Sequence, residues 1–128
     1  MDFIGLTAIE LAALVHEGKA LPSEIVAEHL RQVEAAEPVI HAFLTVRADL
    51  AMAEARALDQ RRDLQQLPLA GVPVGIKDSV AVAGEPIRLG SRATSDQPSL
   101  VDDEIVKRLR DAGCVVLGKT RQPELAYI

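Results

Sequence analysis

The chain has 128 residues, of which 48% are apolar and 2% aromatic, and it carries a formal net charge of −5. Its length suits one globular domain, and its negative charge and scarcity of aromatic rings argue against nucleic-acid binding. No apolar run approaches the roughly 20 residues that span a bilayer, and the single cysteine, Cys114, excludes an intrachain disulfide.

The N-terminal stretch predicts a cytoplasmic protein that begins with a helix. "MDFIGLTAIE" carries acidic residues and lacks the basic start of a secretory signal. In "LTAIELAALVHEGKA", Thr7 and Glu10 have the spacing of a capping box, and Gly18 is a typical residue after a helix end. We therefore expect the first helix to begin at Thr7 and to stop near Gly18.

Two more helices and a short strand are expected before residue 65. "LPSEIVAEHLRQVEAAEP" predicts a helix that starts at Pro22, in its first turn, and that Pro38 should end. "HAFLTV" (41–46) is a candidate strand that begins at His41. "ADLAMAEARALDQRRD" predicts a third helix, and "LQQLPLAG" a loop. Residues 1–65 are thus expected to be an N-terminal helical segment.

Residues 66–128 have the pattern of an α/β unit. "GVPVGIKD" (71–78) alternates apolar and other residues as a strand does, and Asp78 and Ser79 should shape the turn after it. "DDEIVKRLRDAG" predicts a helix, and "CVVLGKT" a short apolar strand. A long connection between two such strands predicts a parallel pair with a right-handed crossover.

"GCVVLGKT" (113–120) also has the spacing of a phosphate-binding loop. That loop needs four residues whose amides turn inward and a helix that starts at the Lys-Thr pair. Here the four residues are apolar and strand-forming, and Pro123 disfavours a helix soon afterwards. We interpret the stretch as a helix stop at Gly113, a buried strand and a turn.

Lys77 is the candidate catalytic residue. It ends the "GVPVGIKD" strand on the face of Gly75, and a glycine inside a strand often marks close approach by a ligand or another backbone. Taken alone, a lysine at a strand end is more commonly solvated or paired with an acid. A larger pattern changes this balance.

The stretches "LAGVPVGIKDSVAVAG", "GSRA" and "DDEIVKRLRDAGCVVLGKTRQPELA" resemble the amidase signature family in the family's order, and so do the N-terminal helices. The resemblance implies an α/β core with a mixed sheet and helices on both sides, of which this chain holds the first strand-helix-strand part. It also implies hydrolysis or transfer at an amide bond of a small molecule by a serine nucleophile, a bridging serine in a cis peptide, and a lysine. Lys77 matches that lysine, and its role as a base requires an uncharged amine.

Some positions depart from the family pattern, which leaves the substrate open. "PIR" (86–88) stands where small hydroxyl residues are common in the family. Arg121 and Gln122 stand where asparagine and an apolar residue are common, and Leu125 where phenylalanine is.

The family's two catalytic serines are expected in a Gly/Ser-rich segment beyond the matched region. Ser79, Ser91, Ser95 and Ser99 do not lie in such a segment. We therefore expect residues 1–128 alone to be inactive and to associate with the remaining part of an amidase or with themselves. Two alternatives stay open: a non-catalytic relative that serves in binding or assembly, and part of the A subunit of a tRNA-dependent amidotransferase.

No cofactor or metal is expected. His16, His29 and His41 do not have the spacing of a metal site. Cys114 begins an apolar strand and is expected to be a small core residue rather than a nucleophile.

Overall fold

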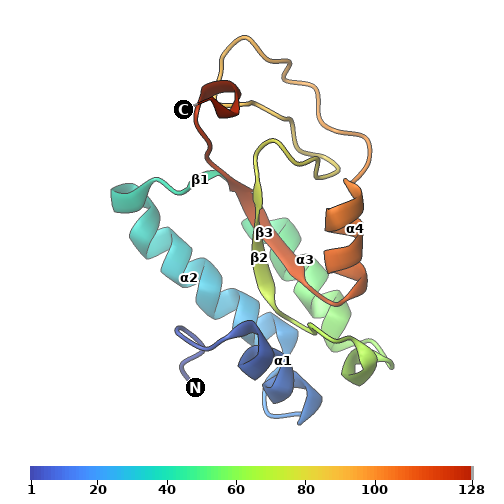
Figure 1. Ribbon diagram of the computed structural model, residues 1–128. Helices are drawn as coiled ribbons and strands as arrows, with labels where there is room; N and C mark the ends of the chain where they lie inside the picture. Colours follow the sequence, from blue (N-terminus) through green and yellow to red (C-terminus); the bar gives the residue numbers. More distant parts are fainter. Residues whose placement is uncertain (128) are drawn as a thin grey trace.

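The computed structural model describes residues 1–127 as a three-stranded mixed sheet with helices on both of its faces (Figure 1). The strand order is β1-β3-β2, so β3 is the central strand. The α/β class and the mixed sheet expected from the sequence are confirmed. The bounds are α1 Ala8–His16, α2 Pro22–Ile40, β1 Phe43–Val46, α3 Ala48–Asp59, η1 Leu64–Gln66, β2 Pro73–Lys77, α4 Glu104–Asp111, β3 Val115–Thr120 and η2 Glu124–Ala126.

The start of α1 follows the capping prediction. The Thr7 hydroxyl accepts the backbone N–H of Glu10, and the Glu10 carboxylate accepts the backbone N–H of Thr7 at 2.7 Å. Gly18 follows the end of the helix in the left-handed conformation, with φ 65°. Both ends of α1 are therefore set by the local sequence.

The end of α2 differs from the prediction. Pro38 lies inside the helix, which continues to Ile40, and His41 is its left-handed cap rather than the first residue of a strand. Near a helix end, proline removes only one backbone hydrogen bond. The Glu37 carboxylate compensates by accepting the backbone N–H groups of Ala42 and Phe43, which also directs the chain into β1.

The two strands that flank the long connection are parallel, as predicted. β2 pairs with β3 in parallel from Pro73 opposite Val115 to Lys77 opposite Thr120. Gly113, with φ 99°, follows α4 as predicted. β3 continues through Gly118, Lys119 and Thr120, which confirms the strand predicted for "CVVLGKT" and the interpretation of the segment as strand rather than phosphate loop.

β1 joins the two segments of the chain into one sheet. It belongs to residues 1–65 and pairs antiparallel with β3. On one face of the sheet, side chains of α2 and α3 pack against Val115 and Leu117. On the other, Val106 of α4 packs against Val116 and Ile76. β3 thus contributes buried residues to both faces, as expected for a central strand covered by helices.

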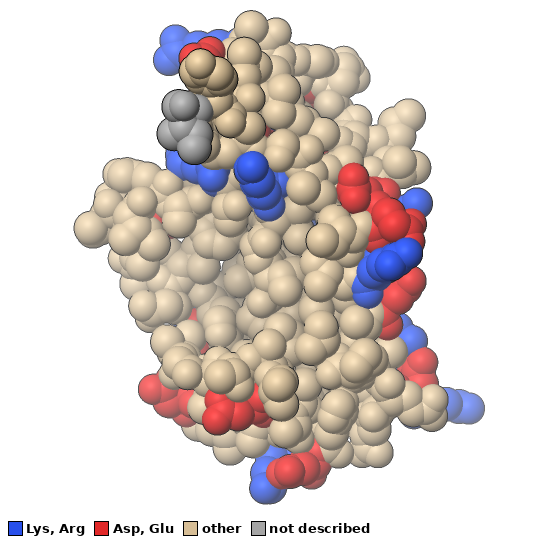
Figure 2. Space-filling view, viewed as in Figure 1, with Lys and Arg blue, Asp and Glu red and all other residues tan. Residues whose placement is uncertain are grey.

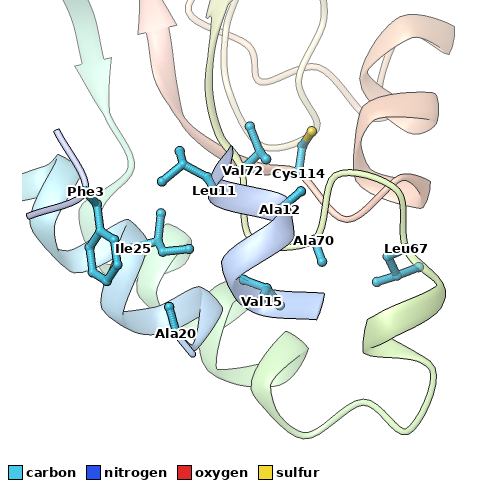
Figure 3. Close-up of a cluster of buried hydrophobic side chains, with 10 residues drawn as sticks. All are labelled: Phe3, Leu11, Ala12, Val15, Ala20, Ile25, Leu67, Ala70, Val72 and Cys114. Carbon is cyan, nitrogen blue, oxygen red and sulfur yellow. The ribbon is translucent and has the colours of Figure 1, made fainter. Parts of the chain in front are cut away.

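A third cluster closes the end of the sheet where β2 and β3 begin (Figure 3). Leu11, Ala12 and Val15 of α1 are buried in the same cluster as Val72 and Cys114, the residues just before β2 and β3. α1 therefore covers the opposite end of β2 from Lys77. None of the helices described in residues 1–127 has the length and apolar character of a membrane span.

A β-bulge in β3 fixes the orientation of its second half. Val74 lies opposite Val116, but Gly75 lies opposite Gly118, so Leu117 is an extra residue in β3. Arg47 holds this bulge from the far side: its backbone N–H donates to the Leu117 carbonyl and its guanidinium to the Val116 carbonyl, both at 2.7 Å.

The Arg47 guanidinium is itself buried and paired with acids. Its side chain is 4% exposed, lies 2.7 Å from the Glu54 carboxylate of α3 and 3.7 Å from that of Glu85. Glu54 also pairs with Arg110 of α4 at 3.0 Å. This network ties both helical faces to the bulge.

We predict that Arg47→Met will lower the free energy of unfolding by about 1–3 kcal/mol, because it leaves the buried Val116 carbonyl without its charged donor and the partly buried Glu54 and Glu85 without this partner. Urea denaturation measures this loss. Arg56→Met, on the exposed side of α3, is the control and should change stability by no more than about 0.5 kcal/mol. A loss below about 1 kcal/mol for Arg47→Met would show that the bulge does not depend on it.

Candidate active site

Lys77 lies at the carboxyl end of β2, the position at which open α/β sheets commonly place ligands. Among the residues that the structure describes, β2 has only β3 as a neighbour. The Lys77 side chain is exposed on this open edge. The close packing that the sequence suggested around it is not provided by residues 1–127.

The close approach at Gly75 comes from the chain itself. A Cβ atom at Gly75 would lie 2.9 Å from the Thr120 side chain and 3.6 Å from the Phe43 ring. Gly118, its partner in β3, would place a Cβ atom 2.1 Å from the Thr45 carbonyl oxygen. The paired glycines therefore let β1 and the Phe43 ring approach the sheet next to the Lys77 end.

The turn after Lys77 is held by the segment that ends β3. The backbone N–H of Asp78 donates to the Thr120 carbonyl at 3.0 Å, and that of Ser79 to the Gln122 side-chain oxygen at 3.0 Å. Asp78 and Ser79 form the turn expected from the sequence. These bonds fix the backbone from which the Lys77 side chain extends.

Lys119 supports the same turn from below the surface. It is 1% exposed, and its amine donates to the Val80 carbonyl at 2.7 Å. Because it pairs with Ile76 across the bulged strand, it shares the face of Ile76. Burial lowers the pKa of Lys119, while the nearby charges of Asp78 and Glu85 oppose that shift.

Asp78 is a second buried charged residue at this turn. It is 1% exposed, and one of its carboxylate oxygens accepts the backbone N–H of Arg88 at 3.0 Å. The other oxygen has no hydrogen-bond partner among the described residues. Asp78 therefore anchors the loop at Arg88 to the turn that follows Lys77. The sequence identified Asp78 as a turn residue but carried no signal for the burial of Lys119, which depends on the bulge.

The remaining candidates have structural contacts. His16 forms a hydrogen bond with the Leu67 carbonyl and His29 with that of Ile25, each at 2.8 Å. Within residues 1–127, no cluster of three His, Cys, Asp or Glu side chains is arranged to hold a metal ion. Cys114 is buried as predicted, and burial raises the pKa of its thiol to about 11, which disfavours the reactive thiolate.

Ser79, Ser91, Ser95 and Ser99 lie in loops and turns, whereas Ser23 lies in α2. The Ser91 hydroxyl accepts the backbone N–H of Ala93, and that of Ser95 accepts the backbone N–H of Gln97. Both bonds stabilise local turns in the connection between β2 and α4. The arrangement thus provides one exposed amine, Lys77, on a backbone fixed by buried groups.

Comparison with known proteins places this geometry in a family context. The family model described as Amidase matches residues 24–128. Two glutamyl-tRNA(Gln) amidotransferases have an A subunit similar to this chain: the one from Acidothermus cellulolyticus is 40% identical and the one from Salinispora arenicola 42% identical. Each match covers 98% of this chain, and 25% and 26% of the respective relative. The chain spans about a quarter of the length of these relatives.

The fold is similar to that of solved amidases. The native peptide amidase from Stenotrophomonas maltophilia has a TM-score of 0.84 and 31% identity, with 95% of this chain and 26% of that chain covered. An amidase family protein from Bacillus anthracis has a TM-score of 0.83 and 30% identity, with 95% of this chain and 25% of that chain covered.

We predict that Lys119→Met will lower the free energy of unfolding by about 1–3 kcal/mol, because it leaves the partly buried Val80 carbonyl without a donor. Lys107→Met, exposed on α4, is the control and should have little effect. Chemical denaturation of both variants measures the difference. Equal stability of the two variants would contradict a structural role for Lys119.

A comparison of the wild type with Lys119→Met at several pH values tests the pKa of Lys119. Folding lowers the pKa of Lys119 below its usual 10.5, so the charged amine lowers the free energy of unfolding at low pH. As the pH rises from the folded-state pKa toward 10.5, the folded protein has already lost this proton and the free energy of unfolding increases. The stability advantage of the wild type over Lys119→Met should therefore grow with rising pH across that window. An advantage that shrinks with pH would contradict the lowered pKa.

Proposed function

The chain belongs to the amidase family, and we propose that it supplies the lysine, Lys77, of an enzyme that hydrolyses an amide C–N bond with two serines. The observation that carries this proposal is the position of Lys77. It ends the parallel strand β2 in the "GVPVGIKD" stretch, at the edge of a sheet similar to that of solved amidases. The proposed location of the enzyme is the cytoplasm.

In the proposed reaction, neutral Lys77 accepts a proton from a bridging serine, which accepts one from the nucleophilic serine. The nucleophile oxygen bonds to the amide carbon, and the amine leaves with the proton that Lys77 returns through the bridging serine. Water then cleaves the acyl-enzyme ester by the same proton route in reverse, which releases the acid and restores the serine. The base thus activates a hydroxyl that is a weak nucleophile by itself.

The surroundings of Lys77 are suited to such a role. Its backbone is fixed by bonds from Asp78 to Thr120 and from Ser79 to Gln122. A fixed backbone at the strand end limits the positions that the flexible lysine side chain can reach. In the proposal, the remainder of the amidase domain covers the open edge of β2 and removes water from the lysine, which favours its neutral form.

A second candidate is the A subunit of an amidotransferase, in which the released ammonia is passed on rather than lost. Sequence identity favours this candidate, because the chain is 40% and 42% identical to two such proteins and 31% identical to the peptide amidase. The discriminating measurement is ammonia release from glutamine with and without glutamyl-tRNA(Gln), followed by analysis for glutaminyl-tRNA. Formation of glutaminyl-tRNA favours this candidate, and amide hydrolysis without it favours the hydrolase.

We predict that Lys77→Ala in the complete enzyme will lower amide turnover by several orders of magnitude, because loss of a base typically costs at least about 10²-fold. Lys77 is exposed in this structure, so folding should change little. Steady-state kinetics and circular dichroism measure the two effects, with Lys107→Ala as the matched control. A variant that keeps more than about a tenth of the wild-type rate would remove Lys77 from the mechanism.

We also predict that residues 1–128 alone lack amidase activity and self-associate. Within residues 1–127, β2 has no strand on its outer side, and such an unpaired edge is a template for pairing with another chain. Sedimentation at several concentrations measures the association, and thermal melting the cooperativity of unfolding. A monodisperse monomer with a sharp melt would show that the segment is a self-sufficient domain.

A further inference from the structure

Three arginines line one surface cavity beside the end of the sheet. The cavity has a volume of about 470 Å³ and contains no acidic residue among those that line it, which are Leu44, Arg88, Gly90, Ser91, Arg92 and Arg121. In a chain with a net charge of −5, such a gathering of positive charge is unexpected. Figure 2 shows several basic side chains on the upper part of the displayed face, whereas most acidic ones lie along its right side and lower end.

This cavity lies at the same end of the sheet as Lys77. Arg121 directly follows Thr120, the residue of β3 that pairs with Lys77. A smaller cavity of about 160 Å³ shares Leu44, Gly90 and Arg121 with the first one and extends to Asp78. The two cavities together extend from the arginines to Asp78, the residue that follows Lys77.

The charges of the arginines are mostly uncompensated. Arg88 pairs with Asp96, whose side chain is 83% exposed. No ion pair joins Arg92 or Arg121 to a carboxylate among residues 1–127, although nine ion pairs occur there. Guanidinium groups on one cavity wall repel one another unless an anion lies between them, and their planar donors match a carboxylate.

The backbone that carries these arginines is fixed. The Arg88 N–H donates to buried Asp78, and the Leu125 N–H donates to the Leu89 carbonyl at 2.6 Å. Gly90, with φ 63°, has room for no side chain, because a Cβ atom there would lie 2.9 Å from the Gln122 carbonyl oxygen. The loop of Arg88 and Arg92 is therefore packed directly against the segment of Arg121, which fixes the backbone positions from which the three guanidinium groups extend.

We propose that this arginine pocket (Arg88, Arg92 and Arg121) binds the carboxylate of the substrate, so that the enzyme acts on amides that also carry a carboxylate. This inference rests on the proposed amidase function and names its substrate class. The pocket holds the carboxylate, and the scissile amide extends toward the end of β2 and Lys77.

The test compares two substrates of nearly the same shape in the complete enzyme: succinamate, which carries a carboxylate, and succinamide, in which an amide replaces it. The wild type should prefer succinamate. In the double variant Arg92→Gln/Arg121→Gln, kcat/KM for succinamate should fall by about 10- to 100-fold, chiefly through KM, while that for succinamide changes little. Arg121→Lys should retain part of the preference, and the exposed Arg62→Gln is the matched control.

A binding measurement separates this inference from the proposed reaction. Calorimetry with succinate as the probe should give a Kd that rises about tenfold or more in the double variant and rises with salt in the wild type. If neither amide is hydrolysed but succinate binds in this way, the proposed reaction fails and the pocket stands. The pocket would be overturned by equal succinate binding in the wild type and the double variant, or by a wild-type preference for succinamide. It would also be overturned by an equal fall in kcat/KM for both amides in the double variant, or by binding of an RNA oligonucleotide in place of succinate.

Discussion

The bulge in β3 is the constraint on which the arrangement of this chain depends. One extra residue, Leu117, changes which face each later residue of the strand occupies. It places Lys119 on the face of Ile76 and leaves Thr120 opposite Lys77. Arg47 secures the bulge through its backbone and its guanidinium, and its acidic partners extend from α3 to the loop before α4. The position of the candidate base is thus a consequence of strand geometry far from its own side chain.

The polar groups behind Lys77 impose a cost that packing elsewhere must offset. Lys119 and Asp78 are each 1% exposed, and burying two charges costs several kcal/mol before their attraction and hydrogen bonds are counted. Three apolar clusters cover both faces of the sheet and the end opposite Lys77. The hydrogen bonds of Lys119 and Asp78 fix the turn after β2 and attach the loop of Arg88 to it. These two buried side chains therefore connect the turn after the candidate base with the loop of Arg88.

Much of the fold could be predicted because its signals are local. The Thr7–Glu10 capping box, the stop at Gly113 and the parallel pair of β2 and β3 follow from short patterns. The wrong predictions concerned features that depend on contacts between residues distant in sequence, or on a side chain that replaces a lost backbone hydrogen bond. Helix α2 passes Pro38, and Glu37 then satisfies the backbone groups beyond it. Of the candidate site, the sequence identified Lys77 through a family resemblance, but the burial of Lys119 and the grouping of Arg88 with Arg121 required the three-dimensional structure.

The central claim is that the end of β2 delivers a lysine to a serine of an amidase. A high-resolution crystal structure of the complete enzyme tests it most directly, through the distance from the Lys77 Nζ atom to the nearest serine Oγ atom. The account predicts a distance of about 2.6–3.2 Å, within a site closed to bulk water by a neighbour on the open edge of β2. A Lys77 amine that stays in solvent, with no serine hydroxyl within reach, would contradict it.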